Sequence, residues 1–129
     1  MNSSESKVRS KNFEEIYANN RWGPTGSSGG GSSRFNTASI THSIITLIRR
    51  RGVRSILDLG CGYGEWLPPA LCAATQDGYL LTGFRYVGWD VARQPVQALR
   101  SHASREWNNC GITWEFNVVD AAVEGVVLP

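Results

Sequence analysis

The chain has 129 residues, 41% of them hydrophobic, and a formal net charge of +2. This length suits one domain, and a charge so close to zero gives no electrostatic case for nucleic acid or membrane as an obligate partner. The three cysteines, Cys61, Cys72 and Cys110, form no C-x-x-C pair. We therefore expect reduced thiols and no metal site, because a disulfide framework or a zinc site uses paired, closely spaced cysteines.

The first 36 residues are expected to form a polar, Gly/Ser-rich lead-in to a domain over residues 37–129. Residues 1–12 are polar, which predicts disorder, whereas residues 13–22 show a short helical spacing of apolar side chains. Residues 23–33 are mostly Gly and Ser, as in a flexible linker. The N-terminus has no apolar core of a secretory signal, and no apolar run reaches the ~18 residues that span a bilayer. The sequence thus predicts a soluble, cytoplasmic protein without a membrane partner.

From residue 37 onward, apolar spacing predicts helices that alternate with strands. In chain order the expected elements are a helix over 37–51, a strand over 53–59, a helix over 65–75, a loop over 76–84, a strand over 86–90, a helix over 92–103 and a strand over 112–119. Such alternation predicts an α/β fold with a doubly wound, Rossmann-like parallel sheet. The last strand alternates strictly between apolar and polar residues, which indicates an edge strand.

A glycine-rich turn follows the first expected strand, in Asp58-Leu59-Gly60-Cys61-Gly62-Tyr63-Gly64. Ligands of open α/β sheets bind at this edge, and glycines let the backbone approach them closely. The dinucleotide fingerprint G-x-G-x-x-G would need its third glycine at Glu65 or Leu67, which disfavours an NAD-type oxidoreductase domain. A glycine turn without a ligand is the alternative. The pattern resembles motif I of class I S-adenosylmethionine-dependent methyltransferases.

Two further acids follow the next strands. Asp90 closes the second strand, where a carboxylate can accept hydrogen bonds from ribose hydroxyls; the alternative is a helix cap ahead of Ala92. Asp120 follows the third strand, and its alternative is a solvated turn acid. Because parallel strands bring their carboxyl ends together, one ligand explains Asp58, Asp90 and Asp120 jointly.

The resemblance implies S-adenosyl-L-methionine (SAM) as the cofactor and methyl transfer as the activity. The cofactor-binding residues that it implies are Asp58, Gly60, Cys61, Gly62, Gly64, Asp90, Val91, Asp120 and Ala121. Residues from Phe13 onward are similar to a narrower group of uncharacterised bacterial and algal methyltransferase-domain proteins, whose motif L-D-x-x-C-G-x-x-x-W is matched from Leu57 to Trp66. The resemblance identifies neither the methyl acceptor nor a catalytic residue. A catalytically silent SAM-binding fragment or pseudoenzyme is the alternative function.

In that family a fourth strand follows the third and pairs with the first. The sequence extends to Leu128-Pro129, so we expect about three strands, which form the SAM-binding half of the domain. The first strand would then have an unpaired edge. Four arginines, Arg49, Arg50, Arg51 and Arg54, lie at the end of the first helix of this domain or just beyond it. We interpret them as a solvated helix end rather than a phosphate contact.

Overall fold

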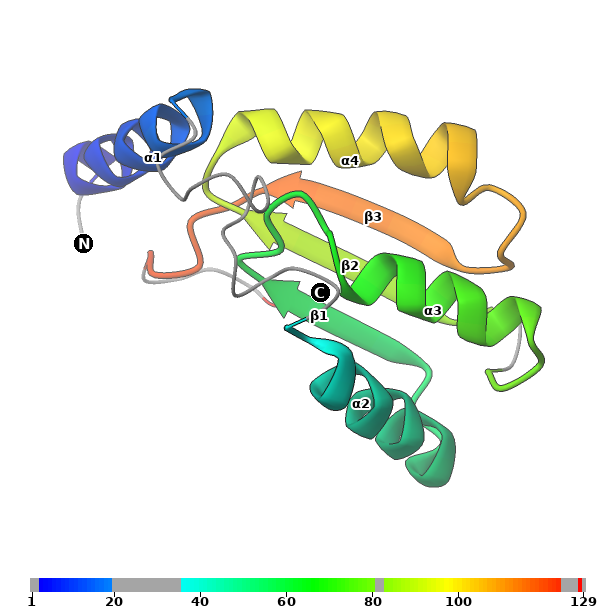
Figure 1. The fold of residues 1–129 in the computed structure, drawn as a ribbon. Helices are drawn as coiled ribbons and strands as arrows, with labels where there is room; N and C mark the ends of the chain where they lie inside the picture. Colours follow the sequence, from blue (N-terminus) through cyan, green and yellow to red (C-terminus); the bar gives the residue numbers. More distant parts are fainter. Residues whose placement is uncertain (1–2, 20–35, 81–82, 124–127, 129) are drawn as a thin grey trace.

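The computed structural model describes residues 3–19, 36–80, 83–123 and 128. Its elements, in chain order, are α1 (Ser3–Ala18), α2 (Ala38–Arg51), β1 (Ser55–Leu59), α3 (Leu67–Gln76), β2 (Arg85–Asp90), α4 (Arg93–Glu106) and β3 (Thr113–Val118). From residue 36 this is the alternation that the sequence predicts, with boundaries that differ from the expected ones by at most three residues. The fold is α/β with a three-stranded sheet, a partial Rossmann-like arrangement (Figure 1).

The sheet is parallel in the order β1-β2-β3. Its register runs from Ser55↔Arg85 to Leu59↔Trp89, and from Arg85↔Thr113 to Asp90↔Val118. The three strands therefore end together, and their arrowheads point the same way in Figure 1. β3 lies at an edge, as its alternation predicts, and among the described residues no strand pairs with the outer edge of β1.

The core lies between α3, α4 and one face of the sheet. Leu71 of α3 and Leu99 of α4 are almost fully buried against Tyr86 and Phe116 of the strands. Trp114 adds a second aromatic ring on β3, stacked with Phe116 at a centroid distance of 6.2 Å. This packing fixes both crossover helices over the strands and leaves the carboxyl ends of the strands available for a site.

The N-terminal segment differs from its expectation. Residues 3–18 form a regular helix, α1, where the sequence predicted disorder to residue 12. In Figure 1 this blue helix lies beside the arrowheads of the strands. Its order depends on contacts with loops far away in the sequence, which local composition cannot reveal. The expected linker over 23–33 lies outside the described residues.

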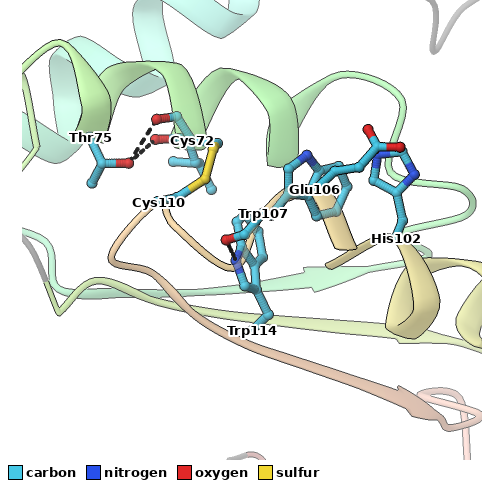
Figure 2. The surroundings of a disulfide bond; sticks show 8 residues. Cys72, Thr75, His102, Glu106, Trp107, Cys110 and Trp114 are labelled. Atoms are coloured by element: carbon cyan, nitrogen blue, oxygen red, sulfur yellow. Dashed lines mark hydrogen bonds and ion pairs between the residues drawn. A yellow bond between two sulfur atoms is a disulfide. The ribbon is translucent and has the colours of Figure 1, made fainter. Parts of the chain in front are cut away.

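The expectation of reduced cysteines is wrong for two of the three. Cys72 and Cys110 form a disulfide, with Cα atoms 5.1 Å apart (Figure 2). The fold brings the last turns of α3 beside the loop between α4 and β3, although the two residues are 38 apart in sequence. Cys61 remains a free, buried thiol. Because disulfides are rare in reducing compartments, this pair gives no support to the cytoplasmic location that the sequence predicts.

None of the described helices has the length and apolar character needed to cross a lipid bilayer.

Candidate functional site

A cavity of about 340 Å³ opens at the carboxyl edge of the sheet. This volume falls in the range of small-molecule sites, roughly 300–1,000 Å³. The residues that line it lie at the carboxyl ends of the strands, in the loops that follow the strands, or in α1: Arg9, Phe13, Tyr17, Asp58, Gly60, Cys61, Glu65, Trp66, Trp89, Asp90, Val91, Val119, Asp120, Ala121 and Ala122. Seven of the nine residues singled out in the sequence are in this set. Gly62 and Gly64 are not, although both belong to the turn beside the cavity.

The turn after β1 adopts a backbone that favours glycine. Gly60, Gly62 and Gly64 have φ angles of 76°, 54° and 60°, in the left-handed region that side chains with a Cβ rarely enter. The amides of Gly60 and Cys61 donate to the carbonyl of Trp89 at 2.8 and 3.1 Å, which folds the turn over the end of β2.

The glycines have different roles. A Cβ on Gly64 would lie 2.7 Å from Cδ2 of Leu99, so this residue lets the turn pack against α4. A Cβ on Gly60 would meet nothing within 4 Å, and Gly60 lines the cavity. Gly64 therefore shapes the fold, whereas Gly60 leaves backbone open to a ligand.

Asp90 connects the glycine turn to the start of α4. Its carboxylate accepts hydrogen bonds from the amides of Gly62 and Ala92, both at 2.9 Å, and the residue is only 5% exposed. The amide of Ala92 belongs to the residue just before α4 and not to the helix itself, so Asp90 orders the approach to the helix without being its N-cap. A carboxylate has about four lone-pair positions, so these two bonds leave acceptor capacity on the side that faces the cavity.

Asp58 lies at the end of β1, and its surroundings penalise the charged form of its side chain. Burial raises the pKa of the Asp58 carboxyl, and the negative charge of Asp90 raises it further. The hydrogen bond that the Tyr86 hydroxyl donates to Asp58, 2.6 Å long, opposes this rise. Burial and the neighbouring Asp58 charge raise the pKa of the Tyr86 phenol, which therefore stays a proton donor. Burial, Asp58 and Asp90 also raise the pKa of the Cys61 thiol well above its usual range. Cys61 is thus a neutral, buried thiol.

Helix α1 closes one side of the cavity and was not anticipated as part of the site. It contacts the loop after each strand: the ring of Tyr17 lies 5.3 Å from that of Tyr63, the Ser10 hydroxyl donates to the Val91 carbonyl at 3.1 Å, and Nε of Arg9 donates to Asp120 at 2.7 Å. The apolar spacing of Phe13 and Tyr17 was the available sequence signal. It indicated a helix but not the surface to which the helix binds.

The lining of the cavity is acidic. Among the described lining residues, the acidic side chains outnumber the basic ones. There are four carboxylates, those of Asp58, Glu65, Asp90 and Asp120, and one guanidinium, that of Arg9. Partial desolvation raises the pKa of Asp120, but the hydrogen bonds from Arg9 and from the Ala122 amide outweigh it, so the net shift is downward. Asp120 therefore remains ionised, and the cavity favours cationic over anionic ligands. The described residues contain no cluster of His, Cys, Asp or Glu that could hold a metal ion.

We expect the Arg9–Asp120 ion pair to hold α1 against the sheet in a pH-dependent way. Arg9→Met should lower the free energy of unfolding by about 0.5–1 kcal/mol at pH 7, as for partly exposed pairs. Because the folded-state pKa of Asp120 is depressed, the stabilisation is present above its unfolded pKa and is lost as the pH falls through the folded value. Urea unfolding of both proteins at pH 7 and near pH 2 measures the difference. Lys7→Met, an exposed charge of the same helix, is the control; an equal effect of both variants at pH 7 would contradict the pairing.

The chain matches no model of a known protein family and no curated protein. Among solved structures it is similar to one from work on the conversion of a disulfide bond into a thioacetal group during echinomycin biosynthesis, with 18% sequence identity and a TM-score of 0.43. The similarity covers 84% of this chain, which spans 40% of the other. A likeness this weak carries no argument about a shared activity.

Proposed function

We propose that the chain is a SAM-binding domain of a class I methyltransferase, which holds S-adenosyl-L-methionine at the carboxyl edge of the sheet for transfer of its methyl group. The observation that carries the proposal is the cavity around the glycine turn, which is lined by one acid at or just after the carboxyl end of each of three parallel strands, Asp58, Asp90 and Asp120. The resemblance of that turn to motif I supports it. The acceptor of the methyl group is unassigned.

The chemistry of the lining fits this cofactor. SAM carries a sulfonium and an ammonium group, and an acidic lining attracts both. The pyrophosphate of NAD would instead meet four carboxylates where it needs free amides. The proposal assigns Asp58, Gly60 and Cys61 to the methionine part, Asp90 and Val91 to the ribose and adenine, and Asp120 and Ala121 to the adenine. Gly62 and Gly64 act indirectly, by holding the turn in shape.

When bound, SAM supplies a methyl group activated by its positive sulfur, so the protein's task is to position and desolvate. Asp90 is held by two backbone amides and therefore offers its remaining lone pairs in a fixed direction. Phe13 and Tyr17 of α1 and Trp66 cover the cavity with aromatic surface, which limits access of water. We assign no general base among the described residues.

The pH dependence of binding tests the proposal. Burial favours the neutral form of Asp58, whereas a nearby cation favours the carboxylate. SAM affinity should therefore rise as the pH rises through the raised pKa of Asp58 and then level off. Asp58→Asn should lower the affinity roughly tenfold, about 1.4 kcal/mol, and abolish this dependence. Calorimetric titration between pH 4.5 and 8 measures both.

The control for this experiment is Asp77→Asn, an acid at the end of α3 that does not line the cavity. It should bind SAM as the unchanged chain does. Loss of affinity in both variants, or a pH dependence that survives in Asp58→Asn, would contradict the assignment of Asp58. Transfer of a radiolabelled methyl group, measured separately, distinguishes a methyltransferase from a silent binding module.

A further inference from the structure

A second cavity, of about 250 Å³, lies at the opposite edge of the sheet. It is formed where α2 leads into β1 and where the loop after α3 leads into β2. Its lining includes Arg49, Val53, Arg54, Tyr79, Leu80 and Phe84. No carboxylate is among the described lining residues, in contrast to the acidic cavity at the carboxyl edge. We call it the basic pocket.

Two exposed arginines, Arg49 and Arg54, line this pocket, and two more lie in the same stretch of the chain. Arg49, Arg50 and Arg51 form the last turn of α2 and Arg54 precedes β1. In the described part of the chain, none of the four guanidinium groups forms an ion pair with a carboxylate. The whole chain has a net charge of only +2, so its positive charge is concentrated here, while the remainder is net negative.

The helix dipole explains only part of this arrangement. Cations in the last turn of a helix are favourable, which accounts for Arg49 to Arg51 as a solvated helix end. Arg54 lies beyond the left-handed Gly52 that ends α2, where that effect has faded, yet it lines the pocket together with Arg49. The dipole also gives no reason for the two aromatic side chains, Tyr79 and Phe84, that line the pocket. We call these two side chains the aromatic floor.

The aromatic floor determines the kind of anion that would fit. The guanidinium of Arg49 lies 5.3 Å from the centre of the Tyr79 ring, and Tyr79 is 56% exposed, so much of its side chain is open to solvent. Phe84 and Leu80 are buried at the base of the pocket. Guanidinium groups beside a flat aromatic ring can contact a phosphate and stack a base at the same time.

We propose that the basic pocket binds a nucleoside phosphate, either free or as a unit of a single-stranded nucleic acid. Arg49 and Arg54 contact the phosphate, and the base stacks on Tyr79. Arg50 and Arg51 add long-range attraction, and they would contact neighbouring phosphates of a strand. The site is independent of the proposed SAM site, because it lies at the other edge of the sheet and has the opposite charge.

The test uses the full chain and two probes, uridine monophosphate and a labelled twelve-nucleotide oligouridine. Uridine avoids the adenosine recognition proposed for the acidic cavity. For the probe that binds the unchanged chain, we expect Arg49→Gln and Arg54→Gln each to lower the affinity about tenfold. Tyr79→Ala should lower it at least fivefold. Arg105→Gln, which removes an exposed arginine from the last turn of α4, is the matched control and should change nothing. Excess SAM should not displace either probe.

Salt dependence separates the two sources. For a strand, the logarithm of the affinity should fall with the logarithm of salt concentration by about 0.7 per phosphate contact, and each arginine variant should reduce that slope. If the mononucleotide binds, and if the salt dependence of its affinity corresponds to one phosphate contact or fewer, the pocket is assigned to a free nucleotide. Binding of neither probe overturns the proposal, as does an equal loss in Arg105→Gln. Retention of full affinity in Tyr79→Ala would also overturn it, because a basic surface that does not need the aromatic ring would attract any polyanion. Circular dichroism checks that this variant is folded.

Discussion

Replacing Cys72 and Cys110 together by alanine is expected to lower the free energy of unfolding by roughly 2–4 kcal/mol. The disulfide closes a loop of 38 residues, and in the chain-entropy account a cross-link of this span removes much of the freedom of the unfolded chain. Both residues are also buried, so alanine, which adds no polar group, is the suitable replacement. For a chain of this size the melting temperature should fall by roughly 10 °C.

The surroundings of the disulfide explain why its loss is expected to affect a whole region. Figure 2 shows Cys110 close to Trp107, whose carbonyl accepts a hydrogen bond from the Trp114 indole at 3.1 Å. The ring of His102 lies tilted against that of Trp107, with the two centroids 4.5 Å apart, and its Nε2 lies 3.0 Å from a carboxylate oxygen of Glu106. The link thus joins α3 to an aromatic cluster that includes the end of α4 and the start of β3.

Thermal unfolding with and without a reductant measures this effect. Reductant should shift the unchanged chain to the melting temperature of the double variant and leave that variant unaffected. Cys61→Ala, which removes the free thiol, should keep the sensitivity to reductant. If the denatured, unreduced chain titrates with three free thiols, the cross-link does not form in solution.

The second large effect is expected for Asp90→Asn, which should weaken both the fold and SAM binding. An asparagine offers one acceptor oxygen and a donor amide, so either the Gly62 or the Ala92 amide loses its partner. Because Asp90 is only 5% exposed, water has little access to the amide that loses its partner, and the loss should cost about 1–3 kcal/mol of stability. Loss of a charge-assisted contact to the cofactor should lower the affinity by about 1.5–3 kcal/mol.

Asp120→Asn is the comparison for Asp90→Asn, because it replaces the equivalent acid after β3. Its bonds come from Arg9 and the Ala122 amide at the rim, so its effect on stability should be smaller. Calorimetry and denaturant unfolding of both variants give the two quantities. If Asp90→Asn loses stability but keeps the affinity for SAM, Asp90 has a structural role and is not part of the cofactor site.

Apolar periodicity in the sequence was sufficient to predict the central elements. The spacing of Ile44 and Ile48 predicts which face of α2 packs against the core, and the alternation through Trp114 and Phe116 predicts that β3 is an edge strand. These signals can be detected within each element, because each element buries only one of its faces. The exposure of Ile40 and Leu47 on α2 could not be predicted, since the spacing does not say how much of the face is covered.

Features that depend on distant partners were not predictable in this way. Arg9 and Asp120 are 111 residues apart, and no spacing within α1 indicates that they meet. The same holds for the disulfide, whose residues carry no motif. The gathering of Asp58 and Asp90 was predictable, because parallel strands end at one edge, whereas the contact of Gly64 with Leu99 instead of the cavity depends on the packing of α4.

We propose that the acidic cavity at the carboxyl edge selects a cationic adenosyl cofactor. Calorimetric titration of the chain with SAM and with NAD, at the same pH and ionic strength, compares the two ligands. We expect one SAM site per chain, weakened in Asp90→Asn, and an affinity for NAD at least tenfold lower, because the pyrophosphate meets the four carboxylates. Binding of NAD as tight as that of SAM, or binding of SAM unaffected by both Asp58→Asn and Asp90→Asn, would contradict it.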